Sequence, residues 1–199
     1  MTKEEEIKSI APSKIRLYSS PDAEFQLEKD YGDEIERKES YHGREILELL
    51  QNVDDAYQSL IEEGKGNKGD KVIAYISLDN DVLTVANTGT AFNYESIKRL
   101  SVGHASQKGD RYIGNKGTGF RSVLNWAKEV EIYSDGYNFR YSKRFATSCF
   151  NQIDKSKIAS QLKNKPDLCL PILSVPEWIE DNVLPKVNLD FFIKANKVV

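Results

Sequence analysis

The stretch that begins at residue 43 constrains the fold most, because its hydrophobic spacing changes once and sharply. Apolar residues recur every three or four positions over 43–62, which predicts a long amphipathic helix. The glycine-rich run Gly64–Gly69 ends this helix, and two β-rich runs follow at 72–78 and 82–86. Strands joined by so short a turn are antiparallel. The sequence therefore excludes a sheet built only from alternating strands and crossover helices.

The remaining elements complete this picture. In chain order, we expect a short helix or arm at 1–22, an amphipathic helix at 23–38, a short helix at 93–100, a helix from about 118, a hairpin with strands at 130–133 and 137–141, an irregular stretch at 143–185 and a last strand at 188–193. This order predicts an α+β fold, a two-layer α/β sandwich whose helices pack on one face of a mixed, mostly antiparallel sheet. We expect residues 23–199 to form one domain behind the arm.

Composition excludes several classes of protein. The chain has 199 residues and a net charge of −3, which disfavours nucleic-acid binding through bulk positive charge but leaves a local basic stripe possible. No apolar run has the length of a membrane span, and the N-terminus lacks a signal-peptide core. Two cysteines are too few for a disulfide framework. We expect a cytoplasmic protein with reduced thiols.

The helix at 43–62 carries a polar strip that borders its apolar face. On a helical wheel, Asn52 lies about 40° to one side of Glu48 and Asp55 about 20° to the other. The strip predicts a carboxylate, an amide and a second carboxylate at a cavity edge, although a solvated helix face remains the alternative. The apolar arc expected to be buried beside the strip consists of Ile46, Leu49, Leu50, Val53, Ala56 and Leu60.

Two glycine-bearing segments follow this helix. Asn87 leaves the end of a strand and Gly89 comes two residues later, so backbone can approach a ligand there; a plain turn is the alternative. The run Gly114–Arg121 leads into a helix and offers backbone N–H groups to an anion, or else acts as a flexible linker. It fits neither the P-loop nor the dinucleotide-binding pattern. The stretch 101–119 is too long for an idle connector.

Taken in order, these segments resemble the motifs of the GHKL ATPase superfamily, whose domain is the Bergerat fold. Glu48–Ala56, which reads ELLQNVDDA, resembles the family's E-x-x-x-N-x-x-D-A helix. Asn87–Gly89 resembles its first glycine motif, and Gly114–Phe120 resembles the second, which ends in G-x-G-F in the chaperone branch. The run Ser101–Val123 is similar to that of the sacsin and plant NO VEIN branch. The resemblance covers about residues 28–142.

The resemblance implies binding of ATP with Mg²⁺ and hydrolysis of ATP. It gives Glu48 the role of orienting or deprotonating the attacking water, and Asn52 that of a Mg²⁺ ligand. The residues to which it assigns nucleotide binding are Asn52, Asp55, Asn87, Gly89, Phe92, Ser106, Lys108, Gly114, Lys116, Gly117, Thr118, Gly119 and Phe120. In the family, the second glycine segment closes over ATP as a lid.

Two departures from the family pattern bear on activity. Asn87 stands where many relatives have Asp, so base selectivity is open, and Lys186–Leu189 lacks the Thr that relatives bring to the adenine site. Chaperone, gyrase and MutL relatives also take a catalytic Lys or Arg from a following domain, which this sequence does not contain. We therefore expect ATP binding with slow hydrolysis at most.

The favoured interpretation is an ATP-driven conformational switch, the N-terminal module of a larger protein or complex. Its expected partners are downstream domains or another protein, with an ATP-dependent dimer also possible. The alternative is a nucleotide-binding or scaffold module that does not hydrolyse ATP. A histidine kinase is disfavoured because His42 lies six residues before Glu48, with no preceding helical hairpin to carry it.

Overall fold

The computed structural model describes residues 1–20, 23, 25–67, 73–102, 119–158, 162 and 168–180. Its α-helices are α1 (Lys3–Tyr18), α2 (Gln26–Ser40), α3 (Glu45–Glu62), α4 (Tyr94–Ser101) and α5 (Lys143–Phe150). Its strands are β1 (Ala74–Asp79), β2 (Val82–Asn87), β3 (Glu129–Ser134), β4 (Tyr137–Ser142) and β5 (Glu177–Trp178). Three 3₁₀ helices are η2 (Gly119–Asn125), η3 (Lys155–Lys157) and η4 (Ile172–Ser174).

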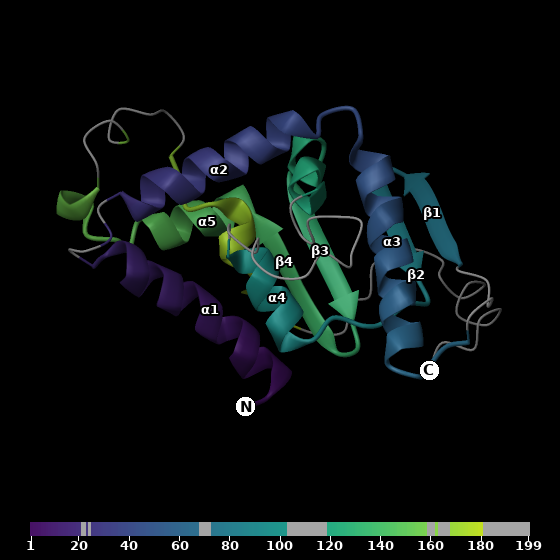
Figure 1. The fold of residues 1–199 in the computed structure, drawn as a ribbon. Helices are drawn as coiled ribbons and strands as arrows, with labels where there is room; N and C mark the ends of the chain where they lie inside the picture. The colour runs from purple at the N-terminus through teal and green to yellow at the C-terminus, as the bar shows by residue number, and fades with distance from the viewer. Residues whose placement is uncertain are drawn as a thin grey trace.

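These elements confirm the α+β class. The described strands form two separate antiparallel sheets, β1–β2 and β3–β4–β5, instead of the single mixed sheet expected from the sequence. The predicted last strand at 188–193 lies outside the described residues. Figure 1 shows α3 and the β1–β2 hairpin at one end of the molecule, with α1, α2, α5 and the larger sheet at the other. Helix α5 and strand β5 correct the expectation that 143–185 is irregular.

Both predicted hairpins are confirmed, and their turns use residues suited to positive φ. Asn80 (φ 47°) and Asp81 (φ 63°) join β1 to β2, while Asp135 (φ 44°) and Gly136 (φ 73°) join β3 to β4. Two consecutive left-handed residues match the right-handed twist of paired strands. Asn, Asp and Gly accept this conformation at the lowest steric cost. The turn residues therefore set the register of each pair.

The three-stranded sheet is apolar on one face and polar on the other. Ile132 pairs with Phe139 across β3 and β4, and both are buried with Tyr137 and Tyr141 on the same face. Helices α1 and α4 cover this face through residues that include Ile7 and Ile97. Pairs on the opposite face are polar, as at Glu131 and Arg140. Strict alternation of this kind requires helices on one side only.

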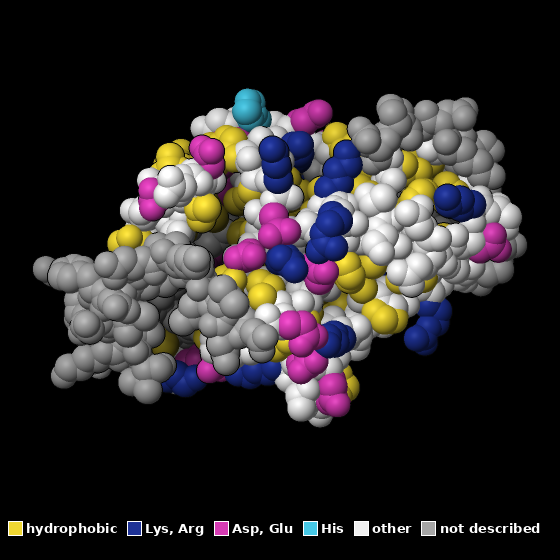
Figure 2. All heavy atoms as spheres, turned by 180° about the vertical axis from the view of Figure 1, so that it is seen from behind, with side chains coloured by type: hydrophobic (Ala, Val, Ile, Leu, Met, Phe, Trp, Pro, Cys, Tyr) yellow, Lys and Arg dark blue, Asp and Glu magenta, His cyan; other side chains and the backbone are white. Residues whose placement is uncertain are grey.

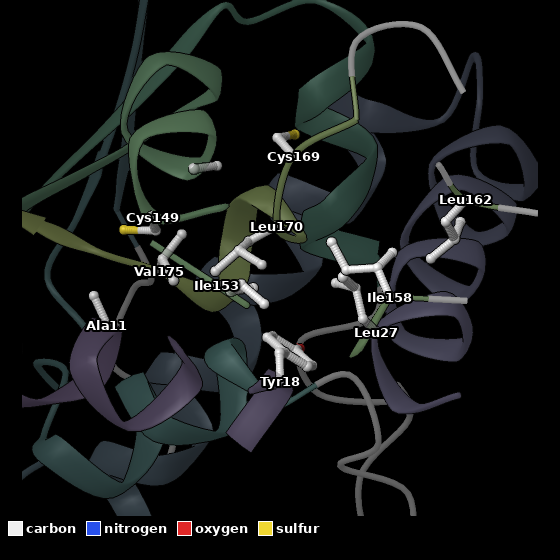
Figure 3. Close-up of a cluster of buried hydrophobic side chains, with 11 residues drawn as sticks. Ala11, Tyr18, Leu27, Cys149, Ile153, Ile158, Leu162, Cys169, Leu170 and Val175 are labelled. Carbon is white, nitrogen blue, oxygen red and sulfur yellow. The ribbon is translucent and has the colours of Figure 1, made fainter. Parts of the chain in front are cut away.

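The N-terminal helix is part of the packing. Thr2 begins α1 with a capping box that it forms with Glu5. Ile7 and Ile10 belong to the cluster over the larger sheet, whereas Ala11 and Tyr18 belong to a second cluster. Figure 3 shows this second cluster, which gathers side chains from α1, α2, α5 and the segment around residue 170. Residues 1–20 thus contribute to both hydrophobic clusters.

Neither cysteine forms a disulfide, and both are buried in the second cluster. Burial raises the pKa of the Cys149 thiol to about 11, which disfavours the reactive thiolate. None of the helices in the described part of the chain is both long and apolar enough to cross a membrane. Figure 2 shows charges of both signs intermixed on the rear face, which fits the small net charge.

A hydrogen bond joins the end of α1 to α2 and can be tested directly. The Tyr18 hydroxyl donates to Asp30 Oδ2 over 2.7 Å in a buried position. Replacing Tyr18 with Phe removes this donor from a buried carboxylate, and we expect a loss of about 1–3 kcal/mol in the free energy of unfolding. Urea denaturation measures this loss. The matched change Tyr133→Phe, on the partly exposed bond to Glu131, should cost less.

Candidate functional site

The predicted polar strip lies on α3 beside its buried face. Glu48, Asn52 and Asp55 are all half-buried, as expected for side chains at the edge of a packed surface. Their spacing of four and three residues places them one above another on the helix. No hydrogen bond to another described residue engages the side chains of Glu48 and Asn52.

The buried arc of α3 differs partly from the prediction. Val53 is buried as expected, but Leu50 is 38% exposed. Tyr57 and Glu45 are buried in addition. A helical wheel assumes that the same face is buried along the whole helix. In the structure, η2 packs against α3 and α2 near their adjoining ends and covers side chains there. The partial burial of the strip agrees with its expected place at the edge of the packed face, and the arc beside it agrees only in part.

Gly89 places the end of the first hairpin against the backbone of α3. A Cβ atom on Gly89 would lie 2.6 Å from Ala56 Cβ and 2.7 Å from the Ala56 carbonyl carbon. The next residue, Thr90, donates its backbone N–H to the Ala56 carbonyl over 2.9 Å. Only glycine permits so close an approach. This contact fixes the Asn-x-Gly segment one turn beyond Asn52 on the same helix.

Gly119 makes an equivalent approach at the other end of the strip. A Cβ atom there would lie 1.8 Å from Glu48 Oε2. Gly119 begins η2 and is buried, so the Glu48 carboxylate takes the space that a side chain would fill. The two glycine contacts therefore fall at residues 48 and 56 of α3, about 12 Å apart along the helix axis. Asn52 lies midway between them.

The strand-end amide is already partly engaged. Asn87 is exposed, and its Oδ1 accepts a hydrogen bond from the Gly89 backbone N–H over 2.9 Å. This local turn uses the side-chain oxygen of Asn87 and does not involve the two N–H donors of the same amide. Phe92 and Phe120 pack against the hydrophobic cluster over the larger sheet, and the Phe92 N–H donates to Ser134 Oγ. Both aromatic residues border the core.

The other residues assigned from the resemblance lie outside the described part of the chain. They are Ser106, Lys108, Gly114, Lys116, Gly117 and Thr118.

A hydrogen bond joins the described residues on either side of this segment. Arg121 Nη2 donates to the Leu100 carbonyl over 3.0 Å in a buried position. Burial lowers the pKa of the Arg121 guanidinium, and the charge of Glu34 opposes that shift. The predicted helix from about 118 is the 3₁₀ helix η2.

A further pair of residues, Glu45 and Asn125, lies beside the strip and was not predicted. Glu45 is 1% exposed, and its Oε1 accepts a hydrogen bond from Asn125 Nδ2 over 3.1 Å. Burial favours the neutral form of Glu45, but hydrogen bonds from backbone amides, Asn125 and His42 hold its pKa below the ordinary value. Asn125 and Glu45 are 80 residues apart, so no local pattern reveals their contact.

The donor set fits a hard cation held mainly by a ligand's own oxygens. The described residues contain no group of three or more His, Cys, Asp or Glu side chains that could hold a metal. Asn52 and Glu48 offer one amide oxygen and one carboxylate. Mg²⁺ is bound in this way, with one or two protein oxygens completed by phosphates and water.

The contact at Gly119 leads to a prediction about Glu48. Replacing Gly119 with Ala would displace the flexible end of Glu48 rather than backbone, so folding stability should change by less than about 1 kcal/mol. Any ATP hydrolysis that needs Glu48 in place should fall at least about tenfold. Phosphate release and urea denaturation measure the two effects. Gly32→Ala on α2, where a Cβ meets nothing within 4 Å, is the matched control.

The fold and site together define an α+β module with a helix-borne polar strip between two glycine contacts. Parts of known proteins are similar in sequence. The chain is 36% identical over 99 residues to "Protein NO VEIN" of Arabidopsis thaliana, which covers 48% of this chain and 3% of that protein. It is 31% identical over 121 residues to the chaperone protein HtpG of Bacteroides fragilis, which covers 52% of this chain and 18% of that protein.

HtpG of Bacteroides thetaiotaomicron is 32% identical over the same length. Neither a protein-family model nor a solved structure matches the chain. The chain spans less than a fifth of these relatives, so the likeness extends to one part of each. Within that limit, the similarity to a chaperone and to NO VEIN agrees with the branch that the motifs resemble.

Proposed function

We propose that this chain is a GHKL-type module that binds Mg-ATP and hydrolyses it slowly. One observation carries the proposal: both glycine segments approach α3, at Glu48 and at Ala56, on either side of Asn52. The Asn52 amide lies between the two contacts, and the Glu48 carboxylate forms one of them. Partial similarity to HtpG supports the same class of module.

In the proposed complex, Asn52 contributes its amide oxygen to Mg²⁺, and Glu48 orients the attacking water. The contact between Gly89 and Ala56 holds Asn87 near α3, so the N–H donors of the Asn87 side chain would define the base end. Because Asn87 Oδ1 already accepts from Gly89, discrimination between adenine and guanine is expected to be weaker than with a free carboxylate. Closure on ATP would alter contacts with a protein partner or a second copy, which extends the proposal to a switch.

Calorimetric titration of the wild type tests the proposal. ATP should bind in the presence of Mg²⁺ and bind markedly less when EDTA replaces it, because part of the metal shell comes from phosphate. GTP measures base selectivity. Phosphate release then separates the slow ATPase from the alternative, a module that binds without hydrolysis. Failure to bind any nucleotide with Mg²⁺ present would refute the proposal.

A further inference from the structure

The 3₁₀ helix η2 is attached to α3 at both of its ends. At its start, Gly119 lies against the Glu48 carboxylate. At its end, Asn125 Nδ2 donates to Glu45 Oε1 over 3.1 Å and to the Lys38 carbonyl over 2.8 Å. Glu45 and Glu48 are one turn apart on α3. The two attachments therefore fix both the position and the direction of η2 along that helix.

The Asn125 attachment has the character of a strong contact. Its acceptor is a carboxylate with only 1% of its surface exposed, which also accepts from His42 Nδ1 over 3.2 Å. Hydrogen bonds to an ionised acceptor are stronger than neutral ones, and a buried carboxylate that loses a donor is costly. Lys38 lies in the last turn of α2, where carbonyls lack partners within the helix. One amide thus joins α2, α3 and η2.

We propose that Asn125 and Glu45 are positioning residues for Glu48. By holding the far end of η2, they keep Gly119 against the Glu48 carboxylate and so limit where that carboxylate can point. The inference rests on the proposed function, in which Glu48 orients the attacking water. Neither Asn125 nor Glu45 has a role in the motifs that resemble the GHKL family, and neither is placed in contact with nucleotide.

Two single variants and one double variant test the attachment. Asn125→Asp sets a second carboxylate against Glu45, and Asn125→Ala removes the donor without adding charge. Combining Glu45→Gln with Asn125→Asp rebuilds one donor–acceptor pair but not the bond to Lys38. We expect Asn125→Asp to lower kcat for ATP hydrolysis about tenfold, with KM changing less than about threefold, because positioning rather than binding is lost. The double variant should recover part of that rate.

Trp126 supplies a readout that needs no nucleotide. It follows Asn125 directly and is 50% exposed, so its emission reports how η2 is seated. The chain has two tryptophans, and Trp178→Phe in every variant leaves Trp126 as the single source of emission. We expect a red shift in Asn125→Asp that is smaller in the double variant. Asn151→Asp, the same change at an exposed position after α5, should alter neither emission nor kcat.

The outcomes separate the inference from the proposed function. Suppose that the parent protein, without changes at Asn125 or Glu45, hydrolyses ATP. If both Asn125 variants then keep its kcat and its emission, the positioning role is wrong but the proposed ATPase activity is not. A double variant slower than Asn125→Asp would show that the two residues do not act as a pair. A parent that binds ATP but releases no phosphate overturns the positioning of Glu48, whereas a parent that binds none refutes the proposed function itself. Circular dichroism confirms that each variant is folded.

Discussion

Replacing Asn52 with Ala is expected to abolish Mg-ATP binding, whereas Glu48→Ala should leave binding intact and remove hydrolysis. Asn52 lies midway between the two glycine contacts on α3. Its amide oxygen can bind a cation, and its amide N–H groups can donate to the phosphates that the cation carries. Losing that ligand should weaken binding at least about 100-fold, which corresponds to about 3 kcal/mol. Removing a group that activates water costs at least about 100-fold in kcat.

Titration calorimetry and phosphate release measure the two effects in parallel. Gln58→Ala and Asp54→Ala are matched controls, because both side chains are exposed on the same helix, away from the strip. They should bind and hydrolyse like the wild type. If Asn52→Ala and Glu48→Ala also behave like the wild type, α3 does not carry the nucleotide site. If Asn52→Ala binds ATP as the wild type does in EDTA but more weakly than the wild type in Mg²⁺, the result would support a role of Asn52 toward the metal.

Local pattern was sufficient where an element is long or its turn is specific. The apolar spacing of 43–62 predicted α3 to within two residues, and both hairpins follow from their turn residues. The short helix expected at 93–100 is α4, and Asn93 caps it with a side chain that accepts from Ser96 N–H. In each case the information lies within a few residues of the feature, so no distant contact was needed.

Helix α5 was missed because its sequence is a weak helix former. The segment KRFATSCF combines an aromatic pair, a β-branched residue and a cysteine. It becomes helical because Ser142 caps it and because Ala146 and Cys149, three residues apart, enter the second cluster. The capping serine and this spacing were visible in the sequence. Whether these two features produce a helix depends on packing against α1 and the segment near residue 170, which lie far away along the chain.

Some features of the candidate site also follow from local sequence, whereas others depend on distant contacts. The position of the strip on α3 follows from helical geometry, and a close approach at Gly89 follows from a turn at a strand end, although the group that lies against Gly89 is the backbone of α3. Neither the burial of Glu45 nor its bond to Asn125 was predictable, since their partners come from three separate elements. Residues that hold a site in place are less visible in a sequence than residues that form it.

Gly89→Ala is expected to lower the free energy of unfolding by about 2–4 kcal/mol and to weaken Mg-ATP binding with it. The added Cβ would meet the carbonyl carbon of Ala56 at 2.7 Å and the backbone nitrogen of Tyr57 at 2.9 Å. Both atoms belong to the middle of a helix and cannot rotate away. The hairpin must therefore move off α3, which breaks the bond from Thr90 N–H to the Ala56 carbonyl.

Urea denaturation of Gly89→Ala, beside Gly32→Ala, distinguishes this contact from a general effect of losing glycine. Gly32 has open space around it within α2, so its change to Ala should stabilise the protein by about 0.5–1 kcal/mol. Adding Ala56→Gly to Gly89→Ala removes the side chain that lies 2.6 Å from the new Cβ but leaves the backbone contacts. It should recover little stability, because it also introduces a glycine into α3. Full recovery would mean that side-chain crowding, not the approach of two backbones, requires glycine at position 89.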